Sequence, residues 1–374
     1  MDKINDESIL DNQDEIEINS PGEANIYPMN EIKVDKGFYT VYELKRRYDA
    51  ESKRIILDSD FQREDVWNID RKSELVESVL MGLPLPIFYF NQDKYGRLIV
   101  IDGRQRLTAL FEYMSGKYAL TRLKVLPNEN KKKFNELSPL LQSRIEDYQI
   151  QAHVIMPPTP DRLKFDIFDR VNRGGMQLNK QEIRNALYQG QSTRLLGEIA
   201  KTQIFMEATD HAFAKEKRMK DKYLLTRYMA VYLFRKNELK DDEGKSYAYK
   251  DDIDELLGKT MEYLNVADPL KVQEIKAMVL ETLQKSLFYC GKDAFRLMRN
   301  GRKTPMNMNV FETIMYCLSF VKGQDDDKKD AVYRDIQRLI NSEEYRENIG
   351  NHRDSEKKLT WRLNKAKEIG MRYM

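Results

Sequence analysis

The spacing of apolar and polar positions predicts strands and helices in alternation through the first half of the chain. Apolar residues recur at helical spacing after Asp70, which predicts a helix with Asp70 as its N-cap. Two short apolar runs, residues 87–91 and 98–101, flank a polar turn and predict a β-hairpin. A helix after Asp102 is expected to run to about Ser115, and Gly116 is its expected C′ residue.

Further helix-start signals and alternating apolar runs predict the remaining elements of the first half of the chain. Thr40 and Glu43 form a capping-box pattern that begins a short helix ending near Tyr48. Ser138 and Pro139 begin another, which ends near residue 145. The remaining predictions are strands at residues 54–57, 118–125 and 149–156.

The second half is predicted to be mostly helical. Asn179 and Glu182 resemble a capping box before an apolar helix start. The helical predictions cover residues 160–171, 183–187, 223–234, 251–264, 270–288, 310–320 and 329–340. Strand patterns fade after Thr159 and Pro160, so we expect a domain boundary there.

These patterns predict an α+β fold class with three segments. Residues 1–35 are rich in Asp, Glu and Asn without a sustained period, which indicates a disordered acidic lead-in. Residues 36–159 are expected to form the mixed domain, and residues 160–374 a mostly α-helical C-terminal domain.

The charged residues suggest candidate binding surfaces only at particular clusters. The 374 residues carry 33% charged side chains but a formal net charge of +2, so a nucleic-acid contact has to come from local clusters. Such clusters occur at residues 45–47, 131–133, 215–222 and 296–303, and a solvated helix face is the default interpretation of each. A DNA-binding groove assembled from several of them is the alternative.

Cysteine and histidine are scarce. Two cysteines and three scattered histidines build neither a disulfide framework nor a metal site, which favours a reducing cytoplasm. His153 stands alone on a predicted strand and is interpreted as structural. No long apolar run or signal-peptide pattern is present, so we expect a cytoplasmic protein with no membrane anchor.

The turn at residues 102–106 carries the clearest candidate chemistry. Gly103 allows a tight turn with room for a phosphate, and the following backbone N–H groups of a helix start point toward it. Arg104 or Arg106 can donate bidentate hydrogen bonds to the phosphate. Asp102 can hold a divalent ion beside a triphosphate or orient one arginine. The alternative is an ordinary strand-to-helix connection with Asp102 as the N-cap and solvated arginines.

Two other segments add weaker signals. Arg63, between Phe61 and Trp67, can reach the same anion, or it can pair with a surface carboxylate while Trp67 anchors the core. The corner at residues 172–185 has a Gly-Gly pair and Arg184, which can meet a phosphate. We slightly prefer a helix-turn-helix corner whose cap satisfies its own N–H groups.

Several ordered motifs together resemble one known family. They are Phe61-Gln62-Arg63 with Val66-Trp67, the segment Ser78 to Pro86, Asp102-Gly103-Arg104-Gln105-Arg106-Leu107-Thr108, and Phe168 to Gly175 followed by Leu178-Asn179 and Glu182 to Asn185. In content and order they resemble the N-terminal domain family of GmrSD-type modification-dependent restriction systems, whose core is similar to the ParB and sulfiredoxin fold. The resemblance covers residues 37–190 through these motifs and extends more loosely over the helical remainder through Phe288 to Arg296. Ordered motifs are more specific than any single one.

The resemblance implies nucleotide binding, and often NTP hydrolysis, within prokaryotic defence against phage or foreign DNA. By carry-over, Asp102, Gly103, Gln105 and Arg106 line the nucleotide site. Gln62 and Arg63 stand across from them. Arg104 departs from the commoner Asp-Gly-Gln-Gln-Arg form, and an extra cation there can strengthen triphosphate binding or alter nucleotide choice. The histidine-centred nuclease domain that usually follows has no matching constellation after residue 160.

We therefore hypothesise an NTP-binding domain coupled to a helical domain that contacts DNA, a partner nuclease or another defence protein. Asp102, Gln105 and Arg106 are the candidate catalytic residues: Asp102 positions Mg²⁺ brought with the NTP, Gln105 orients water, and Arg106 with Arg63 neutralises phosphoryl charge. The remaining candidate binding residues are Gln62, Gly103, Arg104 and Thr108, with a second group at Asn172, Gly174, Asn179, Glu182 and Arg184. The alternatives are a DNA-binding sensor without turnover and, least favoured, a nuclease.

Overall fold

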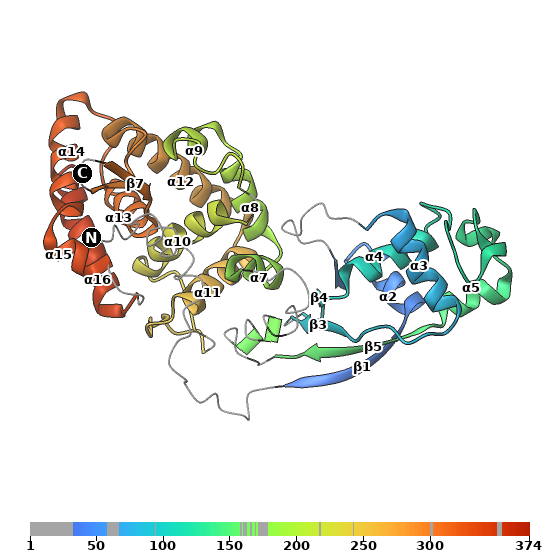
Figure 1. Cartoon of the computed structure of the whole chain (residues 1–374). Coiled ribbons are helices and arrows are strands. Elements are labelled where there is room, and N and C mark those ends of the chain that lie inside the picture. Colours follow the sequence, from blue (N-terminus) through green and yellow to red (C-terminus); the bar gives the residue numbers. More distant parts are fainter. Residues whose placement is uncertain are drawn as a thin grey trace, which may run out of the picture. The chain divides into compact units, whose positions relative to one another are not determined.

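The structure is a computed structural model that divides into two compact units (Figure 1). It describes residues 33–57, 67–93, 95–157, 159, 163–164, 167–168, 170, 179–216, 218–241, 243–299, 302–349 and 354–374. One unit is formed mainly by residues 25–178, and the other mainly by residues 179–184 and 188–374. The expected boundary at 159–160 borders undescribed residues and stays a prediction.

The N-terminal unit is built on a five-stranded mixed sheet. Its order is β1-β5-β3-β4-β2, with β1 at Val34–Thr40, β5 at Gln149–Ile155, β3 at Phe88–Gln92, β4 at Leu98–Asp102 and β2 at Ile55–Ile56. β1 runs antiparallel to β5 and β3 antiparallel to β4, whereas β5–β3 and β4–β2 are parallel. The predicted hairpin of residues 87–101 is therefore confirmed as β3–β4.

Among the described residues of this unit, four α-helices pack with the sheet. They are α2 at Val41–Asp49, α3 at Ile69–Leu80, α4 at Arg104–Met114 and α5 at Pro139–Glu146. Figure 1 shows them on one side of the long β1–β5 pair. Their apolar faces meet the sheet in one core that includes Val76, Phe90 and Leu110. α4 ends as predicted, because Gly116 after it has φ +69°.

One predicted helix cap in this unit is wrong. Asn68, not Asp70, caps α3, by accepting a hydrogen bond from the backbone N–H of Arg71. Asp70 lies in the first turn, where its carboxylate accepts from the hydroxyl of Thr121 and the guanidinium of Arg122. β1 begins at Val34, close to the expected end of the acidic lead-in near residue 35, and pairing with β5 holds it in the sheet. Most of the lead-in lies outside the described residues and stays a prediction.

The segment at residues 118–125 is not the predicted strand. Among the described residues, Leu120 makes backbone hydrogen bonds with Lys131 and Lys132 only. Further along, the carboxylate of Glu77 accepts from the N–H groups of Lys124, Val125 and Leu126 at 3.3, 2.7 and 2.8 Å. Burial opposes the ionisation of Glu77, but these donors outweigh it and lower the pKa of that carboxyl. A buried carboxylate on α3 thus replaces the missing strand partner.

The C-terminal unit is mostly helical, which confirms the α+β fold class with a helical second half. Its helices are α7 Lys180–Leu187, α8 Gln191–Ala200, α9 Gln203–Ala208, α10 Lys220–Arg235, α11 Ile253–Val266, α12 Pro269–Cys290, α13 Met308–Leu318, α14 Asp326–Ile340, α15 Glu343–Ile349 and α16 Glu356–Met371. The predicted helices from residue 223 to 340 correspond to α10–α14, whereas α8, α9, α15 and α16 were not predicted. The helix expected at 160–171 lies mostly outside the described residues. None of the helices in the described ranges is long and apolar enough to cross a membrane.

Some basic clusters do not lie on the helix faces that were the default interpretation. Residues 131–133 lie in a turn and loop. Residues 296–303 were interpreted by default as a solvated helix face, but they belong to a two-stranded antiparallel sheet. β6 spans Arg296–Arg299 and β7 spans Arg302–Met306. Asn-Gly is a common hairpin sequence, so the Asn300-Gly301 pair between the strands was the available signal for this sheet.

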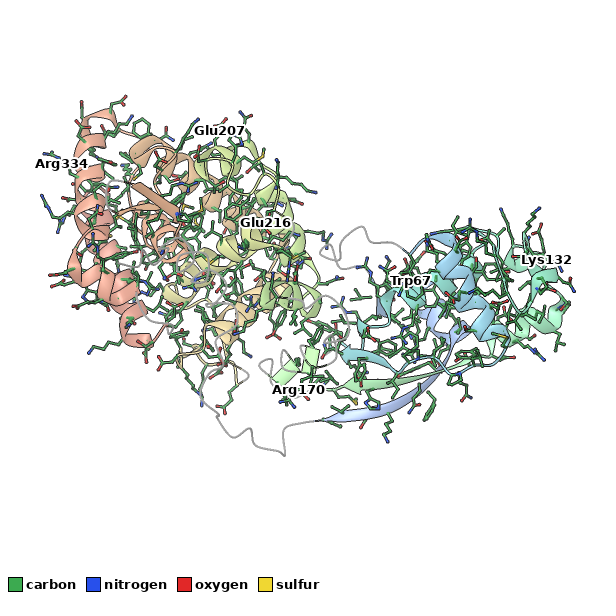
Figure 2. All side chains as sticks on the ribbon, in the orientation of Figure 1. Trp67, Lys132, Arg170, Glu207, Glu216 and Arg334 are labelled. Carbon is green, nitrogen blue, oxygen red and sulfur yellow. The ribbon has the colours of Figure 1, made fainter. Side chains whose placement is uncertain are left out.

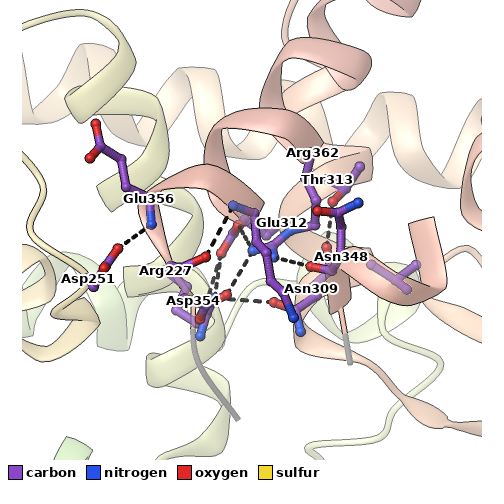
Figure 3. A network of polar contacts seen from close by, with 12 residues as sticks. Arg227, Asp251, Asn309, Glu312, Thr313, Asn348, Asp354, Glu356 and Arg362 are labelled. Atoms are coloured by element: carbon purple, nitrogen blue, oxygen red, sulfur yellow. Dashed lines mark hydrogen bonds and ion pairs between the residues drawn. The ribbon is translucent and has the colours of Figure 1, made fainter. Parts of the chain in front are cut away.

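A buried network of charges lies inside the C-terminal unit (Figure 3). Arg227 on α10 contacts Glu312 on α13 at 3.0 Å and Asp354 at 2.7 Å. Arg362 on α16 contacts the same two carboxylates at 3.2 and 3.0 Å. The exposed fractions of the Arg227, Glu312 and Arg362 side chains are 2%, 0% and 1%. Asp354 is 14% exposed. Two cations and two anions therefore balance in a largely buried site, and they join α10, α13 and α16.

Removing one member of this network is expected to destabilise the unit strongly. Glu312→Gln keeps the volume but leaves two buried guanidiniums with one carboxylate, so we expect a loss of about 3 kcal/mol in the free energy of unfolding. Glu243→Gln is the control, because Glu243 and its partner Lys245 are both more than 70% exposed and that change should cost less than about 0.5 kcal/mol. Urea unfolding measures both, and equal effects would contradict the structural role of Glu312.

Acid should weaken the same network. Burial opposes the ionisation of Asp354, but Arg227 and Arg362 outweigh it and hold its pKa well below the usual range. Because its pKa is lower in the folded state, Asp354 stabilises the fold at pH values above about 3.9, the usual pKa of an aspartate in an unfolded chain. This stabilisation is lost progressively as the pH falls below that value. Urea unfolding at pH 7 and pH 3 should therefore show that Asp354→Asn is much less stable than wild type at pH 7 and closer to it at pH 3. A difference that stays constant with pH would refute this.

Candidate functional site

The candidate site is the turn between β4 and α4. Asp102 is the last residue of β4, and Gly103 is the N-cap of α4 in the left-handed conformation, with φ +97°. The helix has no hydrogen bond from a capping side chain. Asp102 is therefore not the N-cap that the alternative interpretation assumed, and the first turn of α4 begins on a glycine.

Only glycine fits at position 103. A Cβ there would overlap Cδ1 of the Phe88 ring and lie 2.6 Å from its Cε1. Phe88 is buried at the start of β3, beside the pair that Tyr89 makes with Asp102. The close approach of backbone and ring holds the turn against the sheet, and left-handed φ adds a second reason for glycine.

Arg106 is a buried clamp at this turn. Its guanidinium pairs with the Asp102 carboxylate at 2.6 Å and donates to the backbone carbonyls of Pro86 and Ile87, the latter at 3.4 Å. It also lies 4.1 Å from the centroid of the Phe88 ring, which favours a cation–π contact. The side chain is only 11% exposed, so Arg106 is not the solvated arginine of the alternative interpretation.

The environment of Arg106 changes its pKa without neutralising it. Burial lowers the pKa of the guanidinium, and the neighbouring Asp102 opposes that shift. An arginine remains a cation in a protein despite such a shift. Asp102 and Arg106 therefore form an ion pair that joins the end of β4 to the first turn of α4 and to the segment before β3.

Gln105 joins the turn to the start of α3. Its side-chain carbonyl accepts a hydrogen bond from the backbone N–H of Trp67 at 3.5 Å. Trp67, labelled in Figure 2, stacks with the guanidinium of Arg71 at 4.6 Å. Arg104, Gln105 and Thr108 are half-buried, and Thr108 follows Arg104 by four residues on the same helix face. Gln62 and Arg63 lie outside the described residues.

The second group of candidate residues forms the start of α7. Asn179 and Glu182 make the predicted capping box, with bonds of 2.7 and 2.9 Å. Glu182 also binds Arg218 through both carboxylate oxygens, at 2.8 and 3.0 Å. Arg184 is fully buried and pairs with Asp254 at 2.6 Å. Asn172 and Gly174 lie outside the described residues.

A small pocket opens where α7 and α10 begin. Its polar lining includes Asn179, Lys180, Gln181, Arg218, Lys220 and Asp254. Burial raises the pKa of Asp254, but Arg184 and Lys180 outweigh it and lower that pKa. Two of the lining cations are thus already paired, Lys180 with Asp254 and Arg218 with Glu182. In the part of the chain that the structure describes, no group of three or more His, Cys, Asp or Glu could hold a metal ion.

Sequence reasoning missed some residues that build the turn. Phe88 and the carbonyls of Pro86 and Ile87 hold Gly103 and Arg106, yet they precede the motif by about fifteen residues of chain. An aromatic residue opening the strand that pairs with β4 was the available signal. The backbone N–H of Trp67 had no signal in the sequence.

Substitution of Gly103 tests the geometry of the turn. Gly103→Ala adds a Cβ that overlaps the Phe88 ring at an unfavourable φ, so we expect a loss of at least about 3 kcal/mol in the free energy of unfolding. Gly116→Ala is the matched control: its φ is +69° but a Cβ there meets nothing within 4 Å, and it should cost about 1 kcal/mol. Thermal or urea unfolding compares the two, and equal losses would show that the ring contact is unimportant.

The comparisons with known proteins agree with the motifs. Residues 44–189 match the family model described as GmrSD restriction endonuclease, N-terminal domain. No curated protein and no solved structure matches the chain, so the likeness to the ParB and sulfiredoxin fold stays a resemblance. The match includes the sheet from β2 to β5, the turn at Gly103 and the start of α7. Residues 44–189 are therefore a GmrSD N-terminal domain, which relates this protein to restriction systems.

Proposed function

We propose that the β4–α4 turn binds the phosphates of a nucleoside triphosphate in a restriction-related defence protein. The observation that carries the proposal is the glycine N-cap at Gly103, held in place by Phe88 and by the Asp102–Arg106 clamp. A helix that begins on glycine without a capping side chain directs backbone N–H groups and a positive dipole end toward an anion.

The arginines of this turn have different roles in the proposal. Arg104, at the first position of α4, supplies the cation that contacts the phosphates. Arg106 is already engaged by Asp102 and by two carbonyls, so it acts mainly by positioning the turn and adds positive potential from within. Thr108 adds a hydroxyl on the Arg104 face of α4.

Hydrolysis is the further step of this proposal. Mg²⁺ is usually held by one or two carboxylates together with substrate phosphates, and Asp102 fits that requirement because its side chain is 39% exposed while one oxygen pairs with Arg106. Gln105 is the residue to orient the attacking water, and its bond to Trp67 holds the amide in place. Gln62 and Arg63 lie outside the described residues, and their place in the site is proposed from the family resemblance alone.

The second group of residues has a supporting role in this proposal. Asn179 and Glu182 cap α7, and Arg184 is buried against Asp254. These bonds support an interpretation in which the corner fixes the entry to the helical unit, with Asn172 and Gly174 ahead of it. A DNA-binding protein without nucleotide turnover is the second candidate function, and the basic β6–β7 hairpin favours it.

Charge removal at the two ends of α4 tests nucleotide binding. We expect Arg104→Gln to weaken the affinity for a fluorescent ATP or GTP analogue with Mg²⁺ about tenfold, because a charge-assisted hydrogen bond is worth about 1.5–3 kcal/mol. Lys117→Gln removes the same charge from an exposed residue after the other end of α4 and should leave the affinity unchanged. Equal affinities of wild type and Arg104→Gln would refute the site.

Turnover is measured on the same proteins by phosphate release. Gln105→Ala should lower the rate more than the affinity, because water orientation acts in the transition state. Arg106→Lys keeps the charge but loses the planar fork that spans Asp102 and the carbonyls, and should lower both. Rates equal to wild type in both variants would contradict hydrolysis at this turn.

A further inference from the structure

The pocket where α7 and α10 begin lies within the C-terminal unit, and the first turns of three helices line it. From α7 come the N-cap Asn179 and the first two helical residues. From α10 come the N-cap Met219, the residue before it and two residues of the first turn. α11 adds Asp254, its second residue. The positive ends of three helix dipoles therefore meet at one pocket.

Some backbone donors of these turns have no acceptor within their own helix. In α7, the side chain of Asn179 accepts from the N–H of Glu182, whereas the N–H groups of Lys180 and Gln181 precede the first intrahelical acceptor. α10 begins on Met219 in the left-handed conformation, with φ 60° and no hydrogen bond from its capping side chain. Such N–H groups at the start of a helix are donors for an anion.

Gln181 adds a buried donor whose orientation is fixed. Its side chain is 3% exposed, and its Oε1 accepts from the guanidinium of Arg184 at 2.6 Å. Because a guanidinium only donates, this bond establishes which end of the amide is the oxygen. The Nε2 end turns away from Arg184, which is not part of the pocket lining, and has no hydrogen-bond partner among the described residues. A buried donor without an acceptor is costly, and an anion in the pocket would supply the acceptor.

The pocket lining carries more positive than negative charge. It contains the cations Lys180, Arg218 and Lys220 and one carboxylate, that of Asp254. Asp254 is shared by Lys180 at 2.7 Å and by the buried Arg184 at 2.6 Å, so two cations face one anion. Lys220 is half-buried, and among the described residues no carboxylate pairs with its ammonium group.

The neighbouring carboxylates outside the lining are engaged by the helix starts. Glu182 binds the guanidinium of Arg218, and Glu216 accepts from the backbone N–H of the same residue. Asp221 accepts from the backbone N–H of Lys222 at 2.8 Å. These bonds hold the first turns of α7 and α10 in place, and the surface that a ligand meets consists mainly of donors.

We propose that this pocket binds the phosphate group of a small molecule, at a site separate from the β4–α4 turn. A phosphate offers several acceptor oxygens in a tetrahedral arrangement, which suits donors that come from two helix starts, the Gln181 amide and the Lys220 ammonium. The pocket is small and opens to solvent. Only the phosphate group enters it, and the rest of a phosphorylated molecule stays outside.

Hydrogen–deuterium exchange and thermal unfolding of the full-length chain test this proposal. Inorganic phosphate and glycerol phosphate are each compared with chloride and with acetate at equal ionic strength. Both phosphates should slow the exchange of the backbone N–H groups at residues 180–182 and 220–222. Both should also raise the unfolding temperature with concentration, because a ligand that binds the folded state stabilises it. Tighter binding of one of the two identifies free or esterified phosphate as the ligand.

Two substitutions remove one donor each. Gln181→Glu keeps the acceptor for Arg184 but replaces the amide donor by a carboxylate, so the affinity for phosphate should fall at least about tenfold. Lys220→Gln removes the ammonium group and should weaken phosphate binding about tenfold for the loss of one charge-assisted hydrogen bond. Circular dichroism checks that both variants fold, and Lys220→Gln decides the test if Gln181→Glu does not.

The controls make the same changes of charge at exposed positions of the same unit. Gln273→Glu on α12 and Lys201→Gln after α8 should leave the affinity for phosphate as in wild type. The proposal is overturned if phosphate does not protect these N–H groups in the wild type, if acetate protects them equally, or if the two test variants bind phosphate as wild type does.

The nucleotide site is tested separately on the same proteins. Arg104→Gln changes the β4–α4 turn and should leave the protection of α7 and α10 by phosphate intact. Binding of the nucleotide analogue by Lys220→Gln should match wild type. Failure of the pocket is therefore distinguishable from failure of the nucleotide site.

Discussion

The absence of a side chain at Gly103 is the constraint on which the proposed site depends. The backbone there presses against the Phe88 ring in a left-handed conformation, so the end of β4 and the first turn of α4 can approach β3 closely. Arg106 uses that approach to reach Asp102, the carbonyls of the preceding segment and the ring at once. A larger residue would separate these groups, and the start of α4 would no longer be held beside them.

Each unit uses buried polar groups to hold elements that its apolar core alone would not align. In the N-terminal unit, Glu77 satisfies three consecutive N–H groups of a segment without strand partners. In the C-terminal unit, Arg227, Glu312, Asp354 and Arg362 join three helices around a balanced set of charges. Such groups are costly to bury without partners. Because each buried polar group needs a particular partner, these pairs determine which helices and loops lie together. Apolar contacts are less selective in this respect.

The proposed nucleotide site depends on geometry more than on the number of charges. At the β4–α4 turn, the cations are few and the geometry is constrained by Gly103 and the Arg106 clamp, which suits a compact phosphate chain. A small net charge of the whole chain is compatible with such a site, because the placement of charges decides the local potential.

The sequence by itself determined the α+β class, the β3–β4 hairpin, the helix after Asp102, the Asn179–Glu182 cap and the family, because periodicity, turn residues and ordered motifs are local signals. Only the tertiary structure decided the role of Arg106, the need for glycine against Phe88, the cap of α3 at Asn68 and the loop at residues 118–125. The structure also showed that the basic residues 296–303 belong to a two-stranded sheet. These features depend on contacts between residues that are distant in the sequence, or on several side chains that compete for the same hydrogen-bond partner. A local sequence pattern does not show which of these contacts forms.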